Sequence, residues 1–386
     1  MNFELSEEQQ LIRSTVRDFA EREIKPLAKE LDEKGEFSAD LTKKMGEMGL
    51  FGMYLPEQYG GGGMDTLSYI IAVEELARID SSQAATLAAH NSLGIGPIYY
   101  FGTEEQKQNY LPRLSTGENL WGFGLTEPDA GSDSRGTKTK AVKKGDKYIV
   151  NGSKIFITNA ASALAIGSAV QTISGEDEKG RPIFTTFLVD RDTKGYSAVS
   201  MHGKMMWRAS DTAELYFDDM EVSESQILGK VGEGSKIMLQ TLDNGRLSIA
   251  AMGLGLAQGA FELAIQYAHE RKQFGKTIYS FQNTGFRMAE AATKIEMARN
   301  LLYKACWLKD NKKPFAKEAA MSKYICSEIA KEVADLGVQI HGGYGLMKDY
   351  DIERFYRDQR LLQIGEGTSE IQKLVIARYL ADEYIV

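Results

Sequence analysis

Residues with reactive or metal-binding side chains are scarce in this sequence of 386 residues, which contains 2 cysteines and 4 histidines. Cys306 and Cys326 lack the spacing of a zinc or redox motif, and a reducing compartment is a better explanation than a disulfide. No two histidines have the spacing typical of metal ligands. We therefore expect neither a metal site nor a disulfide framework.

An excess of basic charge and a long uninterrupted apolar run are also missing. The formal net charge is -8, which disfavours nucleic-acid binding because such proteins present a basic face. The longest apolar stretch, residues 247–265, contains glycines and Glu262, so it predicts a buried helix and no membrane span. The acidic N-terminus resembles neither a secretory signal nor a transit peptide, and a cytoplasmic location is expected.

Several motifs of common enzyme classes are absent. The sequence has no P-loop, no Gly-x-Ser-x-Gly elbow and no His-Glu-x-x-His motif. The glycines from Gly253 to Gly259 are spaced one residue too widely for the dinucleotide fingerprint, and no β-branched strand precedes them. Small residues that allow close helix packing explain them better. A nicotinamide-binding domain is therefore not expected.

The patterns that are present divide the chain into three regions. Helical periodicity predicts an N-terminal helical domain in residues 1–120, and alternating β-branched and aromatic segments predict a sandwich-like or barrel-like β domain in residues 121–229. Residues 230–386 predict a helical domain similar to a four-helix bundle, so the expected fold class is α+β and multidomain. Strands are expected at 148–150, 155–158, 183–189 and 214–217, and C-terminal helices at 231–270, 282–310, 314–341, 350–358 and 368–383.

Local signals in the first region predict where helices begin and end. Ser6 and Gln9 have the spacing of a capping box. The first helix is predicted to end before Pro26, and a later one by Pro112. The first helix is expected to bury an apolar stripe made of Leu11, Val16, Phe19 and Ile24.

A single carboxylate stands out near the C-terminus. Glu366 lies between Gly365 and Gly367, and Thr368 or Ser369 is a natural cap for the helix that follows. The flanking glycines allow another molecule to approach the carboxylate closely. A capping loop whose carboxylate complements the helix dipole explains the pattern about equally well.

Two hydroxyl-bearing segments mark the β region. Thr126 and Ser132 flank a turn, for which a plain loop is the simplest explanation. Phe156 and Thr158 share one face of a predicted strand, where they serve either strand packing or the binding of a planar ligand.

Three further segments in the helical region carry polar signals. Asp243 and Arg246 lie at a predicted helix start, where an arginine opposes the helix dipole; a surface salt bridge is the alternative. Arg271 beside Phe274 suits a pyrophosphate and an adenine, although a charged helix end is commoner. The glycines that begin at Gly342 are typical of a helix C-cap, and they also expose backbone N–H groups to a diphosphate.

Together these segments resemble the acyl-CoA dehydrogenases, a flavoprotein family, and more closely its short-chain, butyryl-CoA dehydrogenase-like members. The resemblance extends from end to end, and the helical, β and helical regions follow the order of that fold. It assigns Glu366 as the catalytic base. It assigns FAD contacts to Phe123, Leu125, Thr126, Ser132, Phe156, Ile157, Thr158, Arg271, Gln273, Phe274, Gln282, Gln339, Gly342, Gly343, Thr368, Ser369 and Glu370, and substrate contacts to Ser132, Asp243, Arg246 and Gly367.

The resemblance implies α,β-dehydrogenation of an acyl-CoA thioester. Glu366 would remove the α-proton, and the β-hydrogen would leave as hydride to the flavin. An electron-transferring flavoprotein would then reoxidise the FAD, and the enzyme would be a homotetramer holding FAD across a subunit interface. An oxidase that reduces oxygen, or a non-catalytic relative that binds flavin or CoA, remains the alternative.

Gly365 departs from the family pattern, because the short- and medium-chain enzymes commonly have a tyrosine there. Loss of that bulk leads us to expect a wider acyl pocket, suited to branched, cyclic or aromatic-bearing groups. The alternative is that a neighbouring side chain fills the space and the substrate stays short and linear. A short or medium acyl chain is expected overall.

Overall fold

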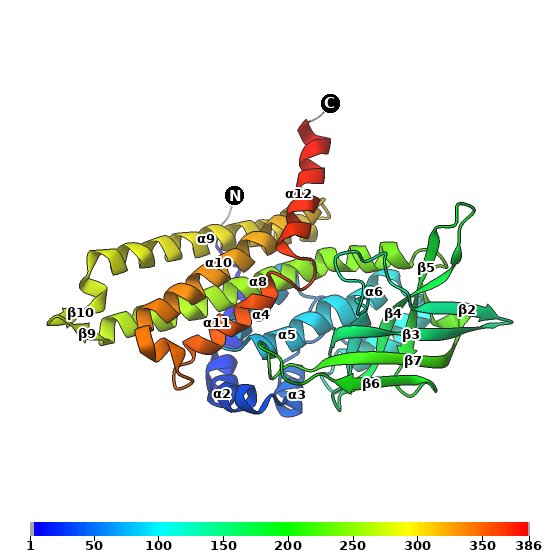
Figure 1. The fold of residues 1–386 in the computed structure, drawn as a ribbon, viewed down its shortest axis with the longest axis horizontal. Coiled ribbons are helices and arrows are strands. Elements are labelled where there is room, and N and C mark those ends of the chain that lie inside the picture. The colour runs from blue at the N-terminus through cyan, green and yellow to red at the C-terminus, as the bar shows by residue number, and fades with distance from the viewer. Residues whose placement is uncertain (1–3, 385–386) are drawn as a thin grey trace.

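The computed structural model describes residues 4–384 and contains the three predicted regions in order (Figure 1). The strands of the middle region gather at one end of the molecule, and the long C-terminal helices extend to the other, where a small hairpin joins two of them. The predicted fold class is confirmed. Both cysteines are free and buried.

The N-terminal region consists of short helices joined by tight turns. Its helices are α1 Glu7–Phe19, α2 Lys25–Lys34, α3 Ala39–Glu47, α4 Thr66–Ala77, α5 Ser81–Ala89, α6 Gly96–Phe101 and α7 Glu104–Leu114, with π-helical turns η1 Ala20–Ile24 and η3 His90–Ile95. The capping box predicted at Ser6 and Gln9 is present.

Three details of the predicted N-terminal helices are wrong. Leu11 is 65% exposed and its neighbour Ile12 is buried in its place, whereas Val16 and Ile24 are buried as predicted. Pro26 does not end a helix; it follows a π-helical turn near the start of α2, where its missing N–H is tolerated. Pro112 likewise lies inside α7, which ends at Leu114.

The middle region is built around one 8-stranded sheet. Its strands are β1 Leu120–Gly124, β2 Lys140–Lys144, β3 Lys147–Thr158, β4 Ala165–Glu176, β5 Pro182–Asp190, β6 Tyr196–Ser200, β7 Thr212–Ser223 and β8 Ile227–Leu228. They follow the order β6-β7-β3-β2-β4-β5-β8, and β1 pairs in parallel with β4. The two segments predicted at 148–150 and 155–158 belong to the single strand β3, which is bulged.

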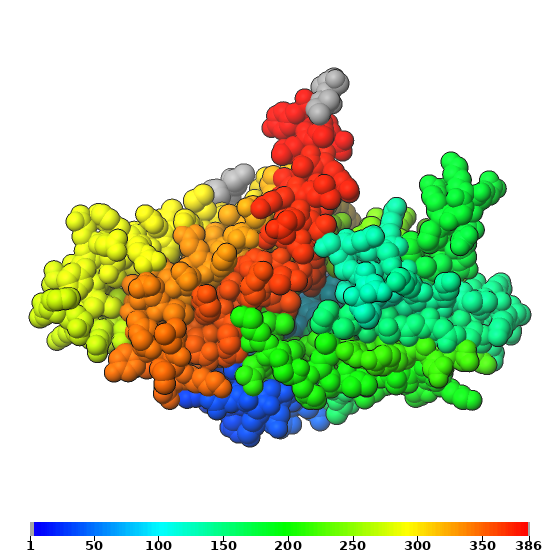
Figure 2. Space-filling model, viewed as in Figure 1, coloured from blue at the N-terminus to red at the C-terminus, as the bar shows by residue number. Residues whose placement is uncertain are grey.

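Five long helices and a small hairpin form the C-terminal region. They are α8 Gly234–Glu270, α9 Gln282–Asp310, α10 Ala316–His341, α11 Ile352–Leu362 and α12 Ser369–Tyr384, with β9 Lys272–Gln273 and β10 Lys276–Thr277 between α8 and α9. α8 runs the length of the bundle, and α12 projects from the body of the molecule (Figure 2).

The helix α8 forms the centre of the structure. It packs against α4, α5, α9, α10 and α11, and near its start it reaches β5. Within residues 4–384 it is the single helix long and apolar enough to cross a membrane, but 72% of its apolar window is buried inside the protein. The buried core helix expected over residues 247–265 is therefore what the structure contains.

Candidate active site

The loop between α11 and α12 presents Glu366 to the interior of the bundle. Glu366 has a φ of 52° and Gly367 a φ of 95°, so two consecutive residues adopt left-handed backbone. The Glu366 carboxylate lies directly against Gly245 of α8, where an added Cβ would overlap its Oε2 atom. Because Gly245 has no side chain, α8 leaves the space that the Glu366 carboxylate occupies.

Burial changes the ionisation of this carboxyl group. Glu366 as a residue is partly exposed, but its Oε2 atom is enclosed and has no hydrogen-bond partner within residues 4–384. Burial raises the pKa of Glu366 to about 7, although the positive charges of Lys323 and Arg246 pull it down. A carboxylate with a pKa near neutral is suited to accept a proton in the normal pH range.

Asp243 and Arg246 lie on the same buried segment of α8. The Arg246 guanidinium donates to the Asp243 carboxylate, and burial raises the pKa of Asp243. The Nε atom of Arg246 is buried without a partner, as is the Asn244 Oδ1 atom beside it. Asp243 and Arg246 do not lie at a helix start, because α8 begins at Gly234, close to the start of the helix predicted over 231–270. Arg246 is buried, so a surface salt bridge does not explain it.

One end of the β sheet carries a face suited to a planar ligand. Phe156 is 62% exposed and has a φ of 61°, at the bulge of β3. An aromatic ring in strained backbone that stays exposed is not strand packing, and such strain gathers at binding sites. Phe123 and Leu125 pack beside Met238 of α8, so this face lies close to the helix that carries Arg246.

A buried ion pair that sequence reasoning missed anchors the loop after β1. Lys154 donates from Nζ to Glu127 Oε1 at 2.8 Å and to the Leu125 carbonyl at 3.2 Å. Glu127 also accepts the backbone N–H groups of Lys138 and Thr139, at 2.5 and 3.1 Å. Alternation along β3 points Lys154 inward, but its partner lies 27 residues away and only the fold reveals it.

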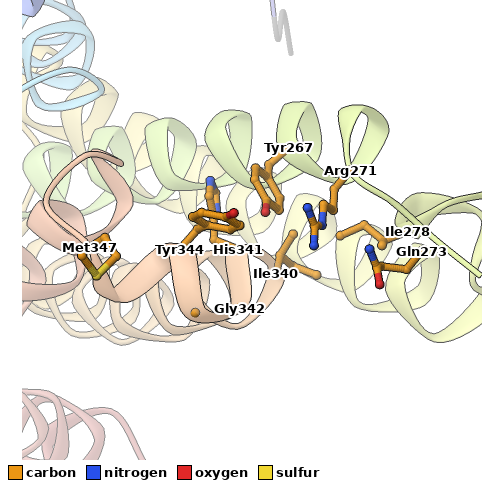
Figure 3. Close-up of a pocket in the computed structure, with 10 residues that line it drawn as sticks. Tyr267, Arg271, Gln273, Ile278, Ile340, His341, Gly342, Tyr344 and Met347 are labelled. Atoms are coloured by element: carbon orange, nitrogen blue, oxygen red, sulfur yellow. The ribbon is translucent and has the colours of Figure 1, made fainter.

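Four of the predicted cofactor residues, Arg271, Gln273, Gly342 and Gly343, line a surface pocket of about 440 Å³ (Figure 3). Arg271 lies over the Tyr344 ring, with 5.8 Å from its guanidinium carbon to the ring centroid. Gly342 has a φ of 61° and open space around it, so its backbone is accessible to a ligand. The pocket is lined by Tyr267, Arg271, Gln273, Ile278, Ile340, His341, Gly342, Gly343, Tyr344 and Met347.

Several predicted residues surround these groups without lining the pocket. Phe274 is 92% exposed, whereas the Ile157 side chain is buried in the sheet core. Thr368 caps α12 by accepting the Ile371 N–H at 3.3 Å, and Ser369 donates to Glu328. Four more of the predicted residues are exposed, namely Ser132, Gln282, Gln339 and Glu370, while Thr126 and Thr158 are half-buried.

The structure therefore divides the predicted cofactor residues into two groups. The first group, around Phe156 and Thr158, lies on β3 of the sheet. The second, around Arg271 and Gly342, lines the pocket at the C-terminal end of α8, next to the β9–β10 hairpin. The two groups lie toward opposite ends of α8, whose 37 residues extend over about 55 Å at ~1.5 Å per residue. One chain does not bring them together.

Comparison with known proteins identifies the family. Models for the N-terminal, middle and C-terminal domains of acyl-CoA dehydrogenase match residues 6–118, 122–220 and 232–381. The chain is 50% identical to "Probable acyl-CoA dehydrogenase YngJ" of Bacillus subtilis, with 98% of this chain and 100% of the relative covered.

Two solved structures resemble the fold closely. Butyryl-CoA dehydrogenase from Megasphaera elsdenii has a TM-score of 0.95 and 41% identity, with coverage of 98% of this chain and 100% of the other. A chain from a study of the electron-transferring flavoprotein of Acidaminococcus fermentans has a TM-score of 0.95 and 46% identity, with coverage of 98% and 99%. The chain belongs to the acyl-CoA dehydrogenase family and is an FAD-dependent acyl-CoA dehydrogenase, which confirms the predicted class and cofactor.

Proposed function

We propose that Glu366 is the base that removes the α-proton of the acyl-CoA thioester. The observation that carries this proposal is the enclosed Oε2 atom, which has no hydrogen-bond partner and belongs to a carboxyl with a pKa of about 7. Such a carboxyl group is about half ionised at pH 7, and its carboxylate is more basic than an exposed one. Gly365 and Gly367 beside it leave room for the thioester to approach.

The remaining residues of the first group position the substrate. FAD, bound against Phe156 and Thr158, supplies the hydride acceptor for the β-hydrogen. The Glu366 backbone N–H is the proposed donor to the thioester oxygen, where negative charge develops as the α-proton leaves. The path of the acyl-CoA is lined by Arg246, Asp243, Gly367 and Ser132. The Arg246 Nε atom, unpaired within residues 4–384, supports a polar contact with the substrate.

We infer that each FAD is held by two chains, in a homotetramer of the kind the family resemblance implies. The separation of the two groups along α8 supports this inference. Phe274, which is 92% exposed, would contact the FAD of a neighbouring chain, as would Arg271 and Gly342. Residues on α9 and α12 that are apolar and exposed, such as Trp307 and Tyr384, would be covered in such an assembly.

Mixing two inactive variants tests the two-chain site. Glu366→Gln lacks the base but keeps Arg271, and Arg271→Glu keeps the base but repels the diphosphate. Co-expressed chains form mixed sites, and one kind of mixed site has both residues intact. We expect activity to return in the mixed assembly. If each chain held its own FAD, the mixture would stay inactive.

The acyl pocket is proposed to be wide at Gly365. A Cβ at this position would meet nothing nearer than the Leu361 side chain at 3.5 Å, which is ordinary contact, so space for a side chain exists there. We propose short or medium acyl groups, including branched or cyclic ones. Restoring the side chain in Gly365→Tyr should lower kcat/KM for branched substrates more than for linear ones; an equal loss for both would contradict a wide pocket.

An electron-transferring flavoprotein is the proposed electron acceptor, and the cytoplasm the proposed location. The similarity to the chain from the Acidaminococcus fermentans study supports the first of these. We also propose domain boundaries near residues 120 and 229, which agree with the gaps between the matched family models.

Anaerobic reduction by a panel of acyl-CoAs is the first test of the function. The purified holoenzyme should lose its oxidised-flavin absorbance with one group of substrates, and Glu366→Gln should retain flavin without that loss. Bound flavin that no acyl-CoA bleaches would contradict the proposed role of Glu366. Reoxidation of the bleached enzyme by oxygen as fast as by the flavoprotein would favour an oxidase.

A further inference from the structure

A buried lysine beneath the Glu366 loop has so far been described only as one of two positive charges that lower the pKa of Glu366. Lys323 lies within α10, its side chain is fully buried, and its Nζ donates to the Gly367 carbonyl at 2.7 Å. Among residues 4–384, no carboxylate lies within 4.0 Å of this ammonium group. A buried, unpaired cation is unusual, since burying a charge is unfavourable unless it is compensated.

The Gly367 carbonyl that Lys323 contacts accepts two side-chain hydrogen bonds. The second comes from Gln372 Nε2 at 2.9 Å, and the same nitrogen lies 3.3 Å from the Glu366 carbonyl. Because Glu366 and Gly367 both adopt left-handed backbone, the loop needs such contacts to keep its shape. Lys323 therefore holds the Gly367 carbonyl, while Gln372 bonds the carbonyls of both Glu366 and Gly367.

Lys323 also contributes charge at the carboxylate. The groups that face Glu366 are Lys323 from α10, Arg246 from α8 and the Tyr69 hydroxyl from α4. Arg246 is already paired with Asp243, and the Tyr69 hydroxyl bonds to Ser248 and the Ala88 carbonyl. The lysine is thus the one cation facing Glu366 that has no carboxylate partner of its own within residues 4–384.

We propose that Lys323 is a positioning residue for the Glu366 base, fixing the loop through the Gly367 carbonyl and favouring the ionised carboxylate through its charge. This inference rests on the proposed role of Glu366. Among the opposite charges acting on Glu366, that of Lys323 lowers its pKa most. Burial lowers the pKa of Lys323 to about 8, while Glu366, Glu328 and Glu370 raise it, so the lysine is charged at neutral pH.

Replacing the lysine separates charge from structure. Lys323→Met keeps the length of the side chain and removes the cation, and Lys323→Arg keeps the cation. Since an unpaired buried charge does not stabilise a fold, Lys323→Met should fold. Lys309→Met is the control, because Lys309 is half-buried and burial likewise lowers its pKa to about 8, but it lies over the rings of Tyr54 and Tyr100, at 5.6 and 5.9 Å.

Two measurements on the holoenzyme test the proposal. The infrared difference between each protein and its Glu366→Gln counterpart reports the carboxyl titration directly. The acid limb of kcat/KM against pH reports it through turnover. In Lys323→Met both midpoints should rise by about one pH unit. The ionised fraction of Glu366 then falls about tenfold at pH values below the midpoint. Lys323→Arg should largely restore them, and Lys309→Met should leave them unchanged.

The outcomes distinguish this inference from the proposed function. If Lys323→Met lowers activity equally at all pH values and the carboxyl titrates as in the wild type, the lysine is merely structural and the inference is overturned. The infrared titration needs no turnover, so it is decisive even when an acyl-CoA fails to react. Loss of the wild-type reaction itself would refute the proposed function and leave the titration result standing.

Discussion

Substitution of Gly245 by alanine should separate folding from catalysis. A Cβ at this position would overlap the Glu366 Oε2 atom and press on Leu93 at 3.2 Å. The carboxylate is the free end of a flexible side chain, so it can move aside without unfolding the protein. Alanine in place of a helical glycine stabilises a helix by about 0.8–1 kcal/mol, which offsets most of the rearrangement.

The effect on the reaction should be much larger than the effect on stability. Displacing a reacting group by about 1 Å can reduce the rate on the order of 100-fold. We therefore expect Gly245→Ala to keep its thermal midpoint within a few degrees and to lose about 100-fold in the rate of flavin reduction by acyl-CoA. Stopped-flow absorbance under anaerobic conditions measures that rate, and calorimetry measures the midpoint.

A second glycine provides the control. Gly285 lies in α9, where an added Cβ would meet only the Tyr279 carbonyl at 3.9 Å. Gly285→Ala should gain the same helix propensity without changing the rate. A wild-type rate of flavin reduction in Gly245→Ala would refute the reasoning, because the carboxylate would then not need the space above Gly245.

Three more expectations follow from the site. The value of kcat/KM should fall about tenfold for each pH unit below 7, because Glu366 must be ionised and its pKa is about 7; a flat profile from pH 5 to 8 would contradict this. Glu366→Gln should raise the free energy of unfolding by up to about 3 kcal/mol at pH 8 and by nothing below pH 4.5. The reason is that the raised pKa makes ionisation of Glu366 unfavourable only in the folded state, and denaturant titrations at both pH values measure the difference. Phe156→Ala should weaken FAD retention during gel filtration while leaving the fold unchanged, because the ring is 62% exposed and packs on little protein; unchanged retention would argue against stacking.

The sequence predicted the features that depend on neighbouring residues. The capping box at Ser6 and Gln9 and the cap at Thr368 follow from local spacing alone, and both are present. The order of the three regions also follows from local periodicity. The predicted burial of Leu11 was wrong because the packed face of a helix is set by the helices beside it, which the sequence of α1 does not contain.

Other features depend on residues far apart in the chain and were not predicted. The contact of Lys323 with the Gly367 carbonyl joins α10 to a loop 44 residues away. The position of Gly245 under the Glu366 carboxylate likewise emerges only when α8 packs beside that loop. The resemblance to a family implied FAD held across a subunit interface, and the length of α8 shows how far apart the two groups of assigned residues lie within one chain.

The length of α8 has a consequence for how cofactor and assembly depend on each other. In the proposed two-chain site, FAD binds assembled chains more tightly than isolated ones, so each bound cofactor favours association by mass action. Dilution should then release FAD and dissociate the assembly together. Added FAD should oppose both FAD release and dissociation. A defect at Arg271 in one chain would empty the site of its neighbour, so damaged chains would inactivate intact ones in the same assembly.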